Sequence, residues 1–221
     1  MGKRAETAAR REPRSPRRHY ATGEASRQRI LEAAERVLAR DGYHAFSTRR
    51  VAQECSICVG NLTYYFPTKI SLIEALMQAI YDRYERRYTE LTLAEGQDSP
   101  DWLASQVTEM LRDAVDPEAS GLFLELWIMA RHHGFGAEVV NRFYEKVAHT
   151  IAKVLSHHYP DRSEQELLRV AYFLMTFGDG VCAIFSRPGD RSVGHDEIIP
   201  LAIEALTGLL SPRSPTSGDA L

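Results

Sequence analysis

One short segment of the sequence, VGNLTYY from Val59 onward, carries side chains that can read DNA bases. Asn61 can form two hydrogen bonds with an adenine, and Val59 or Thr63 can contact the methyl group of a thymine. Leu62 and Phe66 lie four residues apart, which is the spacing of one face of a helix. The pattern predicts a short helix that buries one side and leaves the other side open to the major groove.

The residues before this segment predict a second short helix and a tight turn. Ser47 can cap a helix over about 48–54, because its hydroxyl can accept a hydrogen bond from a free N–H of the first turn. The sequence Cys-Ser-Ile-Cys at 55–58 then separates this helix from the one at about 59–66. These are the dimensions of a helix-turn-helix motif, whose second helix enters the major groove while the first crosses the backbone. Short helix pairs are also common in helical bundles that bind no DNA, so the spacing leaves both interpretations open.

The rest of the chain shows helical periodicity and repeated signals for helix starts. Gly42 is expected to end the first long helix, and Gly134 and Gly136 are expected to separate two later ones. Capping side chains mark four further starts: Ser99 before Pro100, Asp116 before Pro117, Ser163 with Glu166, and Asp196. The sequence therefore predicts an all-α protein of about nine helices, in which the helix-turn-helix motif belongs to an N-terminal three-helix unit.

Charge is distributed unevenly along the chain. Residues 1–69 contain 14 Lys and Arg against 7 Asp and Glu, whereas residues 70–221 contain 13 against 23. The basic end suggests contact with a polyanion, although a basic tail on an unrelated acidic domain would give the same numbers. Residues 1–21 and 212–221 hold few large apolar side chains, and we expect both segments to be disordered.

Size and composition exclude several classes of protein. With 221 residues, 44% of them hydrophobic, the chain can bury a core without disulfides or a metal. The longest uncharged apolar run, Val170–Gly178, is shorter than the roughly 18 residues that a membrane-spanning helix needs. The basic N-terminus lacks the apolar run of a secretory signal, and three cysteines do not suggest a disulfide scaffold. We therefore expect a cytoplasmic protein with no cofactor and no membrane partner.

The stretch Arg27–Leu76 strongly resembles the DNA-binding domain of TetR-family transcriptional regulators. The shared features are Gly42, Ser47-Thr48, Val51-Ala52, Gly60, Leu62, Tyr65-Phe66, Lys69 and Leu72. The remainder resembles the family's helical C-terminal domain more loosely. The resemblance implies a DNA-binding domain at 22–69 and a ligand-binding and dimerisation domain at 70–211. It also implies a homodimer that binds a palindromic double-stranded DNA operator and a small-molecule effector, and we expect a repressor rather than an activator.

The chain departs from the family pattern in and beside the turn. Ser56 replaces the usual glycine, Cys58 the usual cap serine, Val59 a common lysine and Thr63 a frequent tyrosine. Ser56 would have to adopt a left-handed backbone conformation, at a cost of about 1 kcal/mol. Cys58 is a poor helix cap. These changes alter the surface that would meet the bases.

The resemblance assigns two sets of residues to DNA by their position. The base-reading set is Val59, Gly60, Asn61 and Thr63, and the backbone-contacting set is Arg27, Ser47, Thr48, Arg49, Tyr64, Tyr65 and Lys69. Contacts of the second kind set register and affinity but do not read the sequence. Packing between helices is an equally good explanation for Tyr65.

The C-terminal part offers candidates for a ligand pocket and for a dimer interface. Apolar walls with a few polar groups are typical of small-molecule sites, and the candidates are Trp102, Phe123, Trp127, Met129, His132, Phe143, Phe173, Phe177 and Asp179. The helix from Ser163 onward is apolar on more than one face, which predicts burial on all sides. Packing against a second copy would explain this pattern, through Leu167, Val170, Leu174, Ile203, Leu206 and Leu210. A simple core, and the central helix of a monomer, are the alternatives.

Other features of the sequence suggest chemistry less specifically. Cys55 and Cys58 have the spacing of a redox or zinc pair, but without a second pair the metal-ligand set is incomplete. We expect Cys55 to be a buried core thiol. A helical hydrolase or transferase would use His132 or His157 with Asp179, but the chain shows no constellation for a nucleophile. A helical adaptor that binds protein rather than DNA is the remaining alternative.

Overall fold

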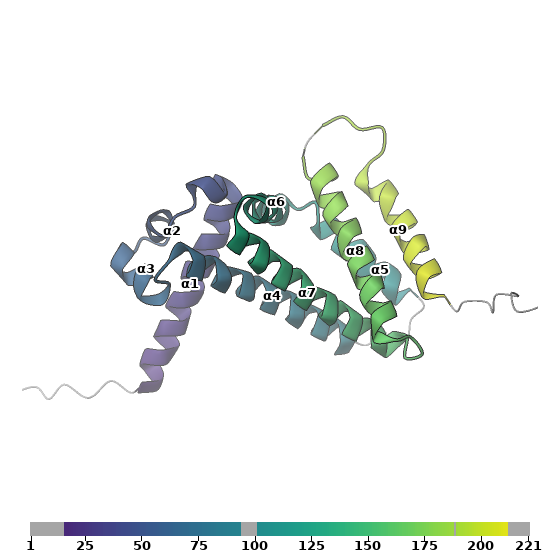
Figure 1. Ribbon diagram of the computed structural model, residues 1–221, viewed down its shortest axis with the longest axis horizontal. Helices are drawn as coiled ribbons and strands as arrows, with labels where there is room; N and C mark the ends of the chain where they lie inside the picture. The colour runs from purple at the N-terminus through teal and green to yellow at the C-terminus, as the bar shows by residue number, and fades with distance from the viewer. Residues whose placement is uncertain (1–15, 94–100, 188, 212–221) are drawn as a thin grey trace, which may run out of the picture.

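Nine α-helices make up the part of the chain that the computed structural model describes, which is residues 16–93, 101–187 and 189–211 (Figure 1). They are α1 (Pro16–Ala45), α2 (Thr48–Glu54), α3 (Val59–Tyr65), α4 (Lys69–Leu93), α5 (Trp102–Asp113), α6 (Pro117–His132), α7 (Gly134–His158), α8 (Glu164–Phe185) and α9 (His195–Leu210). No strand occurs in these ranges, which confirms the all-α class. The predicted helix start at Ser99-Pro100 and the tail 212–221 lie outside the described residues.

The first helix starts earlier than the sequence suggested. α1 begins at Pro16, inside the segment 1–21 that we expected to be disordered, and residues 1–15 lie outside the described part. Proline suits the first position of a helix, because the N–H that it lacks would have no partner there. Near its other end α1 is broken at Gly42, whose φ of 77° lies in the left-handed region. The predicted helix end at Gly42 is thus a sharp break, after which a short helical segment runs to Ala45.

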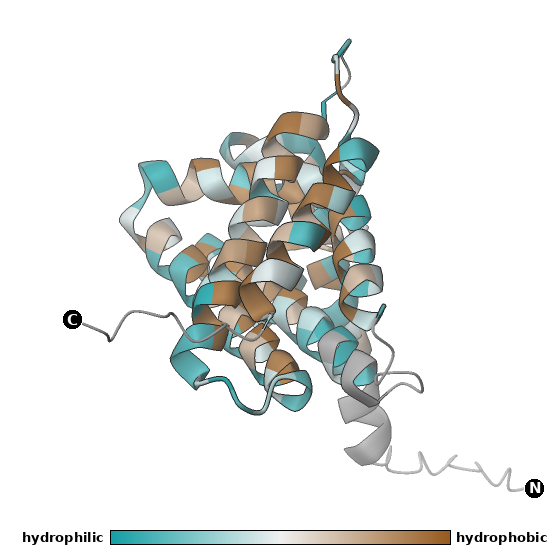
Figure 2. Ribbon diagram, turned by 90° about the vertical axis from the view of Figure 1, so that its right-hand side faces the viewer, coloured by the Kyte–Doolittle hydropathy of each residue, from teal (hydrophilic) through white to brown (hydrophobic). Residues whose placement is uncertain are grey.

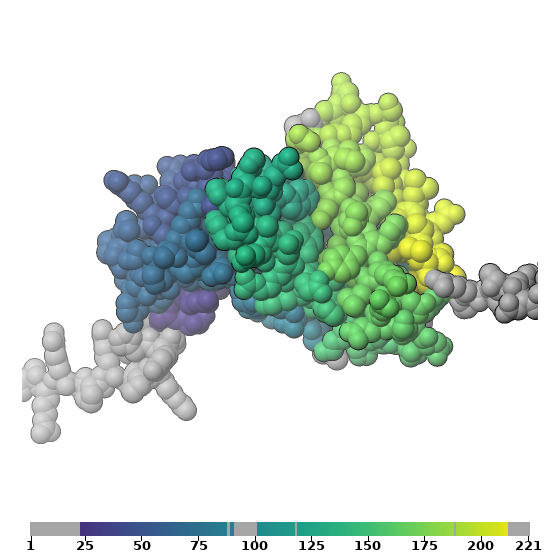
Figure 3. Space-filling model, viewed as in Figure 1, coloured from purple at the N-terminus to yellow at the C-terminus, as the bar shows by residue number. Residues whose placement is uncertain are grey.

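The molecule is elongated, with α1–α3 at one end and α8 and α9 at the other (Figures 1 and 3). The short helices α2 and α3 pack on each other, and α2 packs on α1. α4 and α7 lie together in the middle, α6 packs on both α1 and α7, and α5 packs on α9. Helix α3 is therefore far from the α8–α9 end of the molecule.

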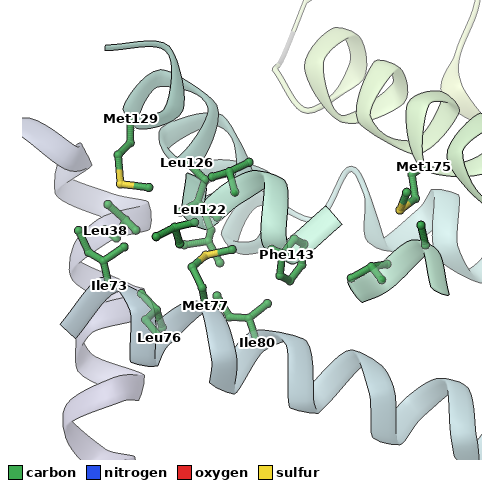
Figure 4. Close-up of a cluster of buried hydrophobic side chains, with 14 of the residues drawn as sticks. Leu38, Ile73, Leu76, Met77, Ile80, Leu122, Leu126, Met129, Phe143 and Met175 are labelled. Atoms are coloured by element: carbon green, nitrogen blue, oxygen red, sulfur yellow. The ribbon is translucent and has the colours of Figure 1, made fainter. Parts of the chain in front are cut away.

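A continuous apolar core joins the N-terminal helices to the rest of the chain (Figure 4). Leu38 of α1, Ile73 of α4 and Leu126 of α6 meet in it, each at most 2% exposed. Phe143 of α7 and Met175 of α8 extend the same cluster toward the far end. Burying one such side chain stabilises the fold by about 1.5–3 kcal/mol. The helix-turn-helix unit is therefore held to the body of the protein by side-chain packing as well as by the chain.

The predicted caps are partly confirmed. Ser163 and Glu166 form the expected capping box, in which each side chain accepts a hydrogen bond from the other residue's backbone N–H. The prediction for the last helix is wrong, because α9 begins at His195 and the carboxylate of Glu197 accepts from the N–H of Gly194 at 2.8 Å. Asp196 lies in the first turn instead, where its charge favours the positive end of the helix dipole.

Among the described helices, α8 is long and apolar enough to cross a membrane by length and composition alone. The sequence expectation missed it, because isolated polar residues interrupt its apolar stretch. A core helix passes the same test, and α8 packs on α7 and α9. Leu167, Ala171 and Leu174 of α8 are buried against their own chain, as expected of a packing helix.

Helices α6 and α7 approach each other closely at Gly136. This glycine lies inside α7 and not, as we expected, in a break between the two helices. A Cβ atom at Gly136 would lie 2.8 Å from the carbonyl oxygen of Met129, whereas one at Gly134 would meet nothing within 4 Å. The missing side chain at Gly136 is thus what allows the two helices to pack.

We predict that Gly136→Ala destabilises the protein by about 1–3 kcal/mol, because the added methyl group forces the two helices apart. Gly134→Ala is the matched control and is expected to be neutral or to stabilise by about 0.4–1 kcal/mol. Urea unfolding followed by circular dichroism measures both values. Equal effects of the two substitutions would contradict the close approach at Gly136.

Candidate functional site

The predicted helix-turn-helix motif is present as α2, a turn at 55–58 and α3. Ser47 caps α2 by accepting a hydrogen bond from the N–H of Arg50 at 3.2 Å. The next residue, Thr48, is partly buried. Ser56 has a φ of 56°, so it adopts the left-handed conformation that we predicted. Cys58 makes no side-chain cap hydrogen bond, also as predicted.

Helix α3 turns one side to the protein and the other to solvent. Leu62 and Phe66 are buried and fix its inner side. The side chains of Val59 and Tyr64 are 39% and 81% exposed. Three of the four predicted base-reading residues are exposed, namely Val59, Gly60 and Asn61. The fourth, Thr63, is partly buried and donates its hydroxyl to the carbonyl of Gly60 at 3.2 Å.

Several arginines next to α2 are already paired with carboxylates. Arg40 lies 2.9 Å from Asp41 and 3.0 Å from Glu54, and Arg50 lies 2.8 Å from Asp41. Hydrogen bonds from Arg40 hold the pKa values of Asp41 and Glu54 below their usual range. Arg49 is exposed and makes no ion pair with the described residues, so its guanidinium is available to an outside anion.

Lys69 is partly buried beside Tyr43. Its Nζ donates to the carbonyl oxygen of Tyr43 at 3.0 Å and lies 3.7 Å from the centroid of the Tyr43 ring. Burial lowers the pKa of Lys69. Lys69 thus ties the start of α4 to the end of α1, and its assignment to the DNA backbone stays a prediction.

Tyr65 and Arg27 lie beside the end of α3. Tyr65 packs against the core and makes an edge-to-face contact with Tyr64, with ring centroids 5.2 Å apart, which favours the packing explanation for Tyr65. The guanidinium of Arg27 lies over the Phe66 ring at 5.5 Å and 3.7 Å from a carboxylate oxygen of Glu24. Arg27 is therefore held close to α3 while part of it stays exposed.

The three cysteines are free and differ in exposure. Cys55 is buried, as expected, and burial raises the pKa of its thiol. Cys182 is also buried, which raises its pKa to about 11. Cys58 is exposed at the start of α3. In the described residues no group of three or more metal-ligating side chains comes together.

Comparison with known proteins agrees with this geometry. Residues 30–76 match the family model of bacterial regulatory proteins, tetR family. An uncharacterised HTH-type transcriptional regulator from the dhlA 5′ region of Xanthobacter autotrophicus is 27% identical over 158 residues, which are 68% of this chain and 74% of that protein. The HTH-type transcriptional repressor KstR of Mycolicibacterium smegmatis is 33% identical over 70 residues, which are 32% of this chain and 34% of KstR. The structure of GusR from Salmonella enterica has a TM-score of 0.67 at 22% identity, over 84% of this chain and 95% of GusR.

The chain belongs to the TetR family of helix-turn-helix transcriptional regulators. It is thus a DNA-binding transcription regulator, and its family is not one of enzymes. The alternative of a helical hydrolase or transferase is set aside on this ground.

The C-terminal part of this TetR-family regulator contains a cavity of about 110 Å³ that opens to solvent. Apolar and aromatic side chains with a few polar groups line it, which is typical of small-molecule sites. Three of the predicted pocket residues line it, namely Phe123, Phe143 and Asp179. Residues that the sequence analysis did not assign to a pocket complete the wall, among them Tyr84, Met110, Tyr144, Met175, Gly178 and Cys182.

Four of the other predicted pocket residues do not line this cavity. Trp102 borders a separate apolar hollow and stacks on His158, with ring centroids 3.7 Å apart. Trp127 lies behind the cavity wall, and His132 is exposed in the last turn of α6. Met129 is fully buried in the core between α1, α4 and α6.

The apolar residues of α8 and α9 fall into a buried set and an exposed set, and the predicted interface residues belong mostly to the buried set. Five of the six residues assigned to a dimer interface are buried within their own chain, namely Leu167, Val170, Leu174, Leu206 and Leu210, and Ile203 is partly buried against the same core. Their exposed neighbours include Phe173, Ile184, Leu201 and Leu209, at 40%, 57%, 59% and 48% exposure. Phe173 and Phe177, which we expected in the pocket, lie on one face of α8 with Ile184, because the spacing is four and seven residues. This face belongs to the end of the molecule that is turned toward the viewer in Figure 2.

Tyr84 and Tyr144 are the most informative residues that the sequence analysis missed. Tyr84 belongs to the apolar stripe of α4, and nothing in the stripe distinguishes a core position from a cavity wall. Tyr144 follows Phe143, and adjacent helix positions differ by about 100° in direction, so both can reach one wall. The hydrogen bond between Tyr144 and Asp179 joins residues 35 positions apart, so the sequence alone gives no signal for it.

We predict that Cys58 is the fast-reacting thiol of the native protein. Ellman's reagent should modify one thiol rapidly and the other two only after denaturation, because Cys55 and Cys182 are buried. Cys58→Ala should abolish the fast phase, and a bound DNA duplex should slow it because Cys58 adjoins α3. Two thiols reacting at equal speed in the native protein would refute the burial of Cys55.

Proposed function

We propose that this protein is a homodimeric repressor that binds a palindromic operator through two copies of α3 and releases it when a small molecule enters the helical cavity. The observation that carries the proposal is the open side of α3, where Val59, Asn61 and Tyr64 project from a helix fixed by Leu62 and Phe66. A helix that is exposed on one side and held on the other is what entry into the major groove requires.

Each exposed residue has a role in this proposal. Asn61 reads an adenine, Val59 contacts a thymine methyl group, and Arg49 and Thr48 hold the phosphate backbone. Gly60 faces open space, because a Cβ atom there would meet nothing of the protein within 4 Å. The missing side chain lets a DNA strand come close to the backbone of α3. Residues 22–69 thus form the DNA-binding part, and residues 70–211 form the part that binds the effector and the second copy.

The exposed apolar stripes of α8 and α9 support the homodimer. Phe173 and Ile184 on α8, and Leu201 and Leu209 on α9, lie at the end of the molecule farthest from α3. A contiguous apolar surface on a protein of this size marks an interaction site, and a two-fold axis through it would form a bundle of four helices. The dimer would then present two copies of α3 to one face of a duplex.

The repressor role is supported by KstR, which is named a transcriptional repressor and matches part of this chain. A repressor needs only to occupy its operator, because bound protein can exclude other proteins from the same DNA.

A series of direct contacts supports the response to an effector. Asp179 in the cavity accepts a hydrogen bond from Tyr144, which in turn accepts one from Trp127 on α6, each at 2.7 Å. Two residues before Trp127, Glu125 accepts the N–H of Tyr43 at 2.8 Å, at the break in α1. A ligand that shifts α6 would therefore shift the helix-turn-helix unit. A coupling of about 1–3 kcal/mol changes operator affinity by roughly 5- to 150-fold.

We predict that two substitutions affect binding to the DNA upstream of the protein's own gene in different ways, one through specificity and the other through overall affinity. Asn61→Ala should lose about 1–3 kcal/mol of discrimination at an adenine position of each half-site, while Arg49→Ala should weaken all duplexes alike and reduce the salt dependence. Arg50→Ala is the matched control, because Arg50 is already paired with Asp41. Gel-shift titrations at two salt concentrations measure these effects, and equal loss on all duplexes for Asn61→Ala would show that α3 does not read bases.

A charge in the exposed stripe of α9 should separate the two subunits. Leu201→Asp is expected to weaken the dimer by at least about 100-fold, because two apolar contacts are lost and two carboxylates are buried at the two-fold axis. Thr207→Asp, on another side of the same helix, is the control and should leave the dimer intact. Sedimentation velocity at micromolar concentration reports the state, and a wild-type monomer would refute the proposed interface.

A further inference from the structure

The cavity has a partly buried carboxyl group on its α8 wall. Asp179 lies between Gly178 and Gly180, and its carboxylate accepts the hydroxyl of Tyr144 at 2.7 Å. The hydroxyl of Tyr144 receives the indole N–H of Trp127, so its own proton is directed toward Asp179. Burial raises the pKa of Asp179 to about 6 in spite of this hydrogen bond. The fold therefore holds a carboxylate whose charge it compensates only in part.

Aromatic rings form the wall of the same cavity on α4, α6 and α7. The rings of Tyr84, Phe123 and Phe143 are in mutual contact, with centroid distances of 6.1–6.4 Å, and Tyr144 lies 5.8 Å from Phe143. Asp179 and these rings line the same cavity, and the pKa of Tyr84 is raised mainly by burial, with a smaller contribution from the charge of Asp179. The negative faces of aromatic rings attract a cation, in particular one that has left water.

The cation at the mouth of the cavity does not balance Asp179. Arg87 lines the mouth but is paired with Asp113, and it also lies 3.0 Å from Glu109. Two carboxylates thus surround one guanidinium at the mouth. Among the side chains that line the cavity, Asp113 and Asp179 carry negative charge and Arg87 carries positive charge, so the lining is net negative, which favours a positive ligand over a negative one.

We propose that the cavity binds an organic cation, in which an aromatic body lies against Tyr84, Phe123 and Phe143 and a quaternary or protonated amine faces Asp179. This inference rests on the proposed function only in taking the cavity as the effector site. An uncharged ligand would leave the partly buried carboxylate of Asp179 without a counter-charge, and an acid would meet the net negative charge of the cavity lining. The thioethers of Met110 and Met175 complete the apolar part of the wall and can adapt to the shape of the ligand.

The binding of a permanent cation should depend on pH in one direction. The titratable and charged groups that line a hollow together with Asp179 are Tyr84 and Arg87 of α4, Asp113 of α5, Tyr144 and Glu145 of α7, and Tyr172 and Cys182 of α8. Burial raises the pKa of Tyr84 and Tyr144, and that of Cys182 to about 11. The hydrogen bond to Glu145 raises the pKa of Tyr172, so none of these four groups titrates between pH 5 and pH 8. Protonation of Asp179 removes its charge as the pH falls through about 6. Affinity should therefore be full at pH 7.5 and decrease toward pH 5.

Three biphenyl probes of the same shape test the charge of the ligand. They are 4-(trimethylammonio)biphenyl, its uncharged carbon analogue 4-tert-butylbiphenyl, and biphenyl-4-carboxylate, and equilibrium dialysis against the full-length protein measures the binding of each. We expect the cation to bind at least about tenfold more tightly than the uncharged analogue at pH 7.5, and the carboxylate to bind most weakly. Tighter binding of the uncharged analogue or of the carboxylate would overturn the proposal.

Two variants locate the effect. Asp179→Asn should reduce affinity for the cation by about tenfold or more and leave the uncharged analogue unchanged, which also shows that the cavity is intact. Glu109→Gln removes a carboxylate outside the cavity wall and is the matched control, with a much smaller effect expected. Equal loss for both variants would mean that the cation responds to the general field and not to Asp179.

Operator binding separates this inference from the proposed function. If the cation binds through Asp179 but does not change the gel-shift titration, the ligand class stands and the response to an effector is wrong. If none of the three probes binds, although the protein binds DNA, the ligand class is refuted and the DNA-binding role remains.

Discussion

The orientation of the DNA-binding end depends on the backbone of Tyr43. Its N–H donates to Glu125 of α6 at 2.8 Å, and its carbonyl oxygen accepts from Lys69 of α4 at 3.0 Å. The preceding residue, Gly42, has a positive φ, and a Cβ there would lie 3.2 Å from the Glu125 carboxylate. One peptide segment thus joins α1, α4 and α6. Because α2 and α3 follow directly after it, a change in any of these three helices alters where α3 points.

Local sequence rules predicted the helix-turn-helix unit well, because short-range geometry decides it. Leu62 and Phe66 could be assigned to the inner side of α3 from their spacing, and Val59 and Tyr64 to the outer side. The left-handed conformation of Ser56 was expected from the resemblance to the TetR family, because Ser56 replaces the usual glycine of the turn. In each case the structure depends on residues within one or two turns of helix, so it can be predicted without knowing the tertiary fold.

The C-terminal helices were harder to predict, because their apolar residues cover several faces. Periodicity shows that Leu201 and Leu206 lie on different sides of α9, but it does not show which side its own chain covers. The same ambiguity placed Phe173 in the cavity together with Phe143, although only Phe143 reaches it. The contacts of Lys69 were missed for a related reason: they join residues far apart in the sequence, and only the fold brings the carbonyl and ring of Tyr43 within reach of Lys69.

In the proposed mechanism, the α3 end and the α8–α9 end of an elongated molecule must move together. The continuous apolar core between them makes this feasible. The dimer contacts at α8 and α9 would set the distance between two copies of α3, which must match half-sites about 34 Å apart. The continuous core between α1 and α6 means that α6 cannot move without moving the end of α1. Both half-sites would then lose register at once, because the two copies of α3 share one dimer axis.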